Sequence, residues 1–191
     1  MRNSFFILIL AALFAVGCGS SKQSKSLSSA EVGDVPEWFL NVPKDPNFLY
    51  SAKTSTSRDL QLAIDKATTD ARAEIGKQVD IKVQDLTKKF TEETGTDNDA
   101  QLLQMMSQAT KTIVSTSLSG SKITQKKILK DNQLFRAYVL VEYPIGAANE
   151  AFLNQIKKNE QMYTRFRAAK AMDELKEEVK EYEASKKEQG Q

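Results

Sequence analysis

Apolar residues recur at every third or fourth position between residues 60 and 90, which predicts one long helix with a single apolar face. The positions on this face are Leu60, Ile64, Ala67, Ala71, Ile75, Val79, Val83, Leu86 and Phe90. Thr56 with Asp59 three residues later resembles a capping box, so we expect the helix to begin there. We expect it to end near Gly95, because glycine readily adopts the left-handed conformation that closes many helices.

A second helix is predicted over residues 100–117, with Asp99 as its N-cap. Its apolar face consists of Leu102, Met105, Met106, Ala109 and Ile113. The acidic turn before it, residues 92–99, does not have the ligand spacing of an EF-hand calcium loop. We therefore interpret this turn as a solvated loop that also caps the second helix.

Alternating apolar and polar residues predict strands over residues 48–54, 122–130 and 133–143, the last two forming a hairpin that turns at Asp131-Asn132. One face of the last strand is apolar and carries Phe135, Ala137, Val139, Val141 and Tyr143. The other face is only half polar, because Leu134, Tyr138 and Leu140 alternate there with Arg136 and Glu142. Either another element covers this face, or its apolar residues form an interaction surface.

Residues 147–191 read as a third helical region whose apolar spacing shifts by three residues between Phe166 and Met172. Two interpretations stay open. The late part projects from the domain, with Met172, Leu175, Val179 and Tyr182 as a candidate interaction surface, or the whole helix lies on the domain. All these elements together predict an α+β fold, with a small antiparallel sheet of about three strands packed by two helices over residues 35–146, plus a long C-terminal amphipathic helix.

The N-terminus has the pattern of an export signal. Arg2 precedes an apolar run over residues 5–16, which as a helix spans only about 18 Å of a hydrocarbon core about 30 Å thick. Such a run is typical of a signal peptide rather than of a transmembrane helix. It ends in small residues directly before Cys18, the only cysteine of the chain.

Ala15-Val16-Gly17-Cys18 resembles the lipobox of bacterial lipoproteins, although the first position of that motif is usually Leu. The resemblance implies cleavage of a signal peptide, residues 1–17, between Gly17 and Cys18, and acylation of Cys18 as a membrane anchor. An ordinary secretory signal with an incidental cysteine is the alternative. Residues 18–34 are serine-rich and predict a flexible tether, and Gly19 after the cysteine favours the outer membrane.

Composition excludes several function classes. The chain has 27 Lys and Arg, 25 Asp and Glu, and no His. There is therefore no imidazole base and no histidine metal site, and a formal net charge of +2 gives no electrostatic case for nucleic acid. The carboxylate pairs Asp70/Glu74 and Glu174/Glu178 lie on charged helix faces, so we predict no catalytic, cofactor-binding or metal-ligating residues.

Several segments resemble the family of twenty-kilodalton bacterial outer-membrane lipoproteins (Lpp-twenty). They are PEWFLNVP at residues 36–43, LYSAKT at residues 49–54, the small-residue stretch around Ala71-Arg72, and AYVLVEYP at residues 137–144. The similarity covers about residues 35–145 and implies an α+β envelope domain without established catalytic residues. A glycine that is common in the family after the first strand is absent here, where Ala52-Lys53-Thr54 stands.

These observations favour a non-enzymatic, lipid-anchored envelope protein that binds or assembles with another envelope protein, or with itself. The alternative is a periplasmic carrier for a small apolar or glycan ligand, with Trp38, Phe39 and Tyr50 lining its pocket or, more simply, plugging one end of the sheet. A hydrolase that works through Asp and Glu alone would need a carboxylate pair converging in a cleft.

Overall fold

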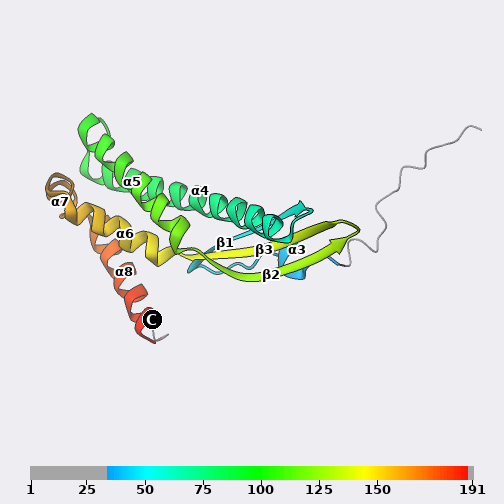
Figure 1. The fold of residues 1–191 in the computed structure, drawn as a ribbon. Helices are drawn as coiled ribbons and strands as arrows, with labels where there is room; N and C mark the ends of the chain where they lie inside the picture. Colours follow the sequence, from blue (N-terminus) through cyan, green and yellow to red (C-terminus); the bar gives the residue numbers. More distant parts are fainter. Residues whose placement is uncertain (1–33, 189–191) are drawn as a thin grey trace, which may run out of the picture. The chain divides into compact units, whose positions relative to one another are not determined.

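Three antiparallel strands form an open sheet in the order β1-β3-β2, with β1 over Phe48–Ser57, β2 over Lys122–Asp131 and β3 over Leu134–Pro144 (Figure 1). This computed structural model describes residues 34–188. Residues Val35–Gln191 form one compact unit. The predicted α+β class and the three-stranded antiparallel sheet are confirmed.

The long helix α4 (Leu60–Thr94) and the helix α5 (Ala100–Gly120) follow β1 in the chain, and α4 covers one face of the sheet (Figure 1). The predicted apolar face of β3 lies against α4, since Ala137, Val139 and Val141 are fully buried. The C-cap at Gly95 is confirmed, with φ at 64°, and so is the N-cap at Asp99, whose side chain accepts from the Leu102 amide at 3.0 Å.

The predicted start of α4 is wrong by three residues. Asp59, not Thr56, is the N-cap, and its carboxylate accepts a hydrogen bond of 2.7 Å from the Leu62 amide. The cause is the length of β1, which continues to Ser57 because Ser57 pairs with Phe135. Thr56 is therefore part of the strand and has no free helical amide to cap.

The second face of the sheet is covered in its middle by α3 (Glu37–Leu40). The ring of Phe39 meets that of Tyr138 edge to face, with 4.9 Å between centroids. At the hairpin end the turn lies at Asn132-Gln133, one residue later than predicted, and Asn132 adopts a φ of 54°. Asparagine tolerates this left-handed conformation better than most residues do.

The predicted C-terminal helical region is present, but it is divided into three helices instead of one. It consists of α6 (Ile145–Lys158), α7 (Glu160–Phe166) and α8 (Lys170–Glu188). The first break falls at Asn159, whose side chain accepts a 3.0 Å hydrogen bond from the Met162 amide and caps α7. The second break coincides with the three-residue shift in apolar spacing, which a straight helix cannot follow while keeping both faces buried.

These three helices complete the core beside the C-terminal half of α4. Phe90 of α4 lies 5.9 Å from Phe152 of α6 and 4.9 Å from Phe166 of α7 between ring centroids, and all three side chains are fully buried. Each buried aromatic ring contributes about 2–3 kcal/mol by removing apolar area from water. The helices α4 and α5 therefore share one hydrophobic core with the three helices of the C-terminal region.

Candidate binding cleft

A large hollow lies at the end of the sheet where β1 begins and β3 ends. Its volume is about 850 Å³, and its lining comes from β1, α4, α5, β2, β3, α6 and α8. The backbone holds this end together, because the Ile145 amide at the start of α6 donates to the Asn47 carbonyl at 2.8 Å. Pro144 stops β3 here and leads directly into α6.

Two tyrosines and a glycine form one wall of the cleft. A Cβ atom on Gly146 would lie 2.3 Å from Cγ of Tyr182, so the tyrosine ring lies directly on the glycine backbone. Tyr143 is only 3% exposed, and burial raises its pKa to about 12, with smaller contributions from Tyr182 and Glu150. Burial also raises the pKa of Tyr182. Both phenols are therefore neutral near pH 7 and offer hydroxyl groups beside apolar rings.

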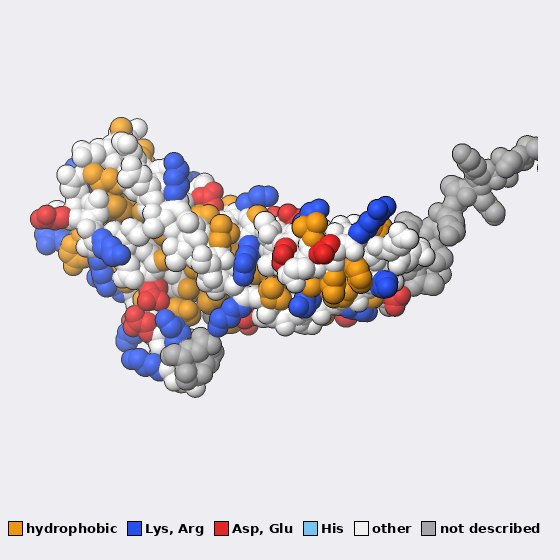
Figure 2. All heavy atoms as spheres, in the orientation of Figure 1, with side chains coloured by type: hydrophobic (Ala, Val, Ile, Leu, Met, Phe, Trp, Pro, Cys, Tyr) orange, Lys and Arg blue, Asp and Glu red, His pale blue; other side chains and the backbone are white. Residues whose placement is uncertain are grey.

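Charges of both signs line the cleft. Lys186 of α8 pairs with Glu150 of α6 at 3.6 Å, and its ammonium lies 5.1 Å from the Tyr182 ring centroid. Lys82 and Glu181 also line the cleft. Figure 2 shows acidic and basic side chains next to one another over α8. The cleft therefore suits a ligand that carries apolar groups together with charged or hydrogen-bonding ones.

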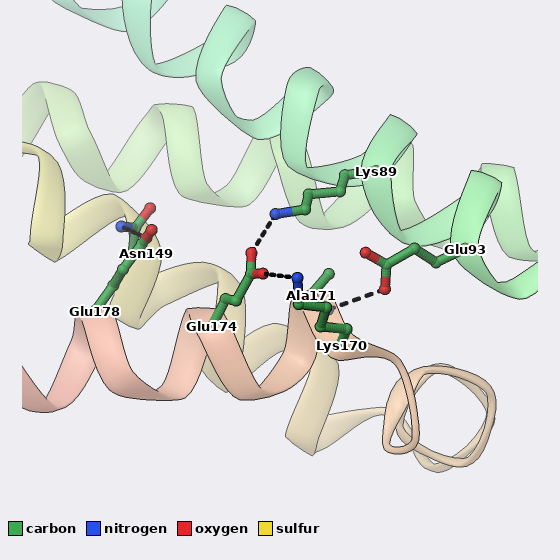
Figure 3. Close-up of polar contacts among 7 residues, drawn as sticks. All are labelled: Lys89, Glu93, Asn149, Lys170, Ala171, Glu174 and Glu178. Atoms are coloured by element: carbon green, nitrogen blue, oxygen red, sulfur yellow. Dashed lines mark hydrogen bonds and ion pairs between the residues drawn. The ribbon is translucent and has the colours of Figure 1, made fainter.

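A set of polar contacts holds α8, and with it one side of the cleft, against α4 and α6 (Figure 3). Glu174 of α8 pairs with Lys89 of α4 and, at 3.4 Å, with Lys170. The hydrogen bond to Lys89 is the main cause that holds the pKa of Glu174 below its usual value, and the same bond raises the pKa of Lys89.

The start of α8 is capped from another helix. The Ala171 amide donates to Glu93 Oε2 of α4 at 2.9 Å, which satisfies one of the free amides at this helix end (Figure 3). Farther along α8, Glu178 accepts a 2.8 Å hydrogen bond from Asn149 of α6. These carboxylates thus hold α8 against α4 and α6.

The interaction surface predicted on the late part of the C-terminal helix is wrong for three of its four residues. Met172, Leu175 and Val179 are buried in the core of the same chain. The break before α8 reverses the chain, so that this apolar face packs inward and does not project. Of the predicted residues, only Tyr182 lies at a site that a ligand can reach, since it lines the cleft.

The surface predicted on the hairpin is also largely covered. Tyr138 and Leu140 are buried on the face where α3 lies, and Phe39 contacts Tyr138. Leu134 alone stays 44% exposed, because it lies at the turn beyond the reach of α3. The interpretation that another element covers this face is the one that the structure supports.

The aromatic residues considered for a ligand pocket are split between two places. Trp38 meets the edge of Phe39 at 6.4 Å between centroids, and both rings are half-buried on the covered face of the sheet. Tyr50 lines a separate hollow of about 450 Å³ with Pro43 and Gln78. They do not build one pocket.

Two further acidic side chains, Glu74 and Asp99, form ion pairs with neighbouring elements. Glu74 pairs with Lys53 of β1 at 3.7 Å and with Lys77 at 3.6 Å, and Asp99 pairs with Arg165 of α7 at 3.4 Å. Within residues 34–188, no group of three or more Asp, Glu, His or Cys side chains is arranged to hold a metal ion. Across the same residues, no helix is both long enough and apolar enough to cross a membrane. Gly17 and Cys18 lie outside the described residues.

The cleft itself was not predicted. Its lining comes from seven elements that are far apart in the sequence, and no short motif marks it. Comparison with known proteins gives no further assignment, since no family model and no curated protein matches the chain.

Proposed function

We propose that this chain is a lipid-anchored protein of the bacterial envelope, without catalytic activity of its own, that binds another envelope component at the cleft. The observation that carries the binding role is the hollow of about 850 Å³ with tyrosine rings and charges of both signs in its lining. A partner segment with apolar and charged side chains would find complementary groups there.

The anchor rests on the lipobox-like Ala15-Val16-Gly17-Cys18 and on the serine-rich residues 18–34 that lead to the folded part. The resemblance to the Lpp-twenty family supports the outer membrane as its location. A single acyl chain binds a membrane only weakly, whereas several acyl chains on Cys18 would give stable attachment. We expect a Cys18→Ser variant to lose palmitate labelling and to leave the membrane fraction, while a Ser28→Ala control keeps both.

In-cell photocrosslinking tests the binding role. A photoreactive amino acid at Asn154, which is exposed and lines the cleft, is compared with one at Gln108 on the exposed side of α5. We expect a defined envelope protein to be captured from position 154 and not from position 108. Equal capture from both positions, or none from position 154, would contradict a partner at the cleft.

The same hollow favours one second candidate, a carrier for a small amphipathic or glycan ligand. Its volume lies within the range of about 300–1,000 Å³ that is typical of small-molecule sites. Native mass spectrometry of protein purified from membranes separates the two functions. A carrier retains a ligand of constant mass, and a Tyr182→Ala variant loses it, whereas an assembly module carries no such mass.

A further inference from the structure

The two edge strands of the sheet, β1 and β2, differ in how readily a strand of another chain could pair with them. The edge strand β2 has a bulge between Ile123 and Gln125 and carries Lys122, Lys126, Lys127 and Lys130. Bulges and lysines are the features by which edge strands avoid pairing with other chains. In β1, by contrast, the only charge is Lys53, which is neutralised by Glu74 of the chain's own α4, and there is no proline.

In the second half of β1, which leads into α4, the outward-pointing backbone groups can hydrogen-bond to another strand. Gln78 of α4 donates to the Tyr50 carbonyl at 3.1 Å, so this outward-pointing group is satisfied by the chain itself. Alternate residues of an antiparallel strand point both backbone groups to the same side. Ala52, Thr54 and Thr56 therefore direct theirs away from β3, and no strand within residues 34–188 pairs with them.

We propose that this edge pairs with the same edge of a second copy of the chain, antiparallel and about a two-fold axis at Thr54. Thr54 then faces Thr54 of the second copy, and Ala52 faces Thr56. All these residues have outward-pointing backbone groups, so each pair exchanges both hydrogen bonds. Thr–Thr is a favourable cross-strand pair, and no two charged residues of β1 face each other in this strand register.

The position of α4 fits such a dimer. This helix contacts β1 and β3 alike, so we place its axis midway between them, about half of the ~4.8 Å strand spacing inward from β1. Across the proposed axis the two copies of α4 would then lie about 10 Å apart, twice the strand spacing, which matches the 8–10 Å of packed helices. The sheet and the helices can therefore associate together.

Two exposed apolar side chains of α4 support the same arrangement. Glu74 pairs with Lys53 of β1, and Gln78 donates to the Tyr50 carbonyl. These two residues therefore mark the side of α4 that faces the β1 edge. Ile81 and Leu60 lie on that side by helical periodicity, and they are 61% and 39% exposed.

Their spacing matches the proposed axis. With rises of about 1.5 Å per helical and 3.3 Å per strand residue, the contacts of Glu74 and Gln78 place residues 70–71 of α4 above Thr54. Leu60 and Ile81 are equally far from that point. In an antiparallel pair of α4 helices, Leu60 of one copy therefore meets Ile81 of the other. The proposal goes beyond the binding role of the cleft and does not depend on it.

Sedimentation of the mature chain with Cys18→Ser tests the dimer. We expect a mass that doubles with concentration, and a loss of association by about tenfold or more in Thr54→Lys, because two lysines then meet at the axis. A Thr112→Lys control on the exposed side of α5 should associate like the parent. Mixing Thr54→Lys with Thr54→Glu should restore association, since opposite charges then face each other.

A cysteine at the axis gives a second readout that needs no charge. Thr54→Cys in the Cys18→Ser background should form a disulfide-linked dimer on mild oxidation, because opposed residues of a hydrogen-bonded pair lie about 5.5 Å apart at Cα. Thr112→Cys should stay monomeric under the same treatment. A parent chain that is monomeric at all concentrations, or a dimer that Thr54→Lys does not weaken and Thr54→Cys does not crosslink, would overturn the proposal.

Discussion

The ring of Tyr182 lies on the backbone of Gly146 so closely that a single methyl group at position 146 would come within 2.3 Å of its Cγ atom. This contact joins the last helix to the start of α6 and forms part of the cleft wall. The nearest atoms are Cβ, Cγ and Cδ2 of Tyr182 and not its flexible end, so the side chain cannot simply turn away.

We therefore expect Gly146→Ala to destabilise the protein by about 1–3 kcal/mol through overpacking, even though alanine favours a helix more than glycine does. Urea unfolding measures this loss. The double variant Gly146→Ala/Tyr182→Ala should unfold at a higher urea concentration than the sum of the single effects predicts, because the clash is gone. Strict additivity would contradict the contact.

Tyr143 should make the protein less stable at high pH. Its pKa is about 12 in the folded state and 10.0 in an unfolded chain, so its contribution is complete below pH 10 and is lost as the pH rises through 12. The difference corresponds to as much as about 3 kcal/mol. Tyr143→Phe should unfold like the parent at pH 8 and lose less stability between pH 10 and 12, while a Tyr163→Phe control keeps the parent's alkaline decline.

Glu174 should contribute stability that depends on pH in the opposite range. Its pKa is lowered from 4.5 by Lys89, so the contribution is present above about pH 4.5 and disappears as the pH falls through the lowered value. Glu174→Gln should therefore unfold at lower urea than the parent at pH 7, and at the same urea as the parent near pH 2. The exposed Glu177→Gln serves as the control, and a difference that persists at pH 2 would exclude this ion pair as its source.

The burial of the last helix is testable at one side chain. Leu175 is fully enclosed in the core, so Leu175→Ala should cost about 2–5 kcal/mol of unfolding free energy. Lys176→Ala on the exposed side should change it by less than about 0.5 kcal/mol. A loss at position 175 as small as that at position 176 would mean that this face of α8 is in water.

Local chemistry made much of the fold predictable. Gly95 and Asp99 end one helix and begin the next as predicted, because a left-handed glycine and a capping carboxylate act through their immediate neighbours. The three strands were likewise evident from the alternation of apolar residues. Even the turn at Asn132 was misplaced by only one residue.

The wrong predictions concern features that depend on contacts between residues far apart in the sequence. Asn159 continues the helical spacing between Ile156 and Tyr163, yet it ends α6 and caps α7, since the role of a polar side chain depends on which amides are free. The local sequence predicts a helix start at Thr56, but Thr56 belongs to β1, because pairing with β3 extends that strand to Ser57. The cleft brings together residues such as Lys82 and Lys186, and the spacing of apolar residues along the chain could not predict that they both line it.

The order in which the chain is synthesised gives the last helix a special place. Met172, Leu175 and Val179 close a core that already contains Phe90 and Phe152, so the folded state cannot be complete until these residues have left the ribosome or a translocation channel. A nascent chain stopped before α8 exposes that core to proteases. Of the described elements, α8 is the last to be synthesised, and the core is complete only when it has packed.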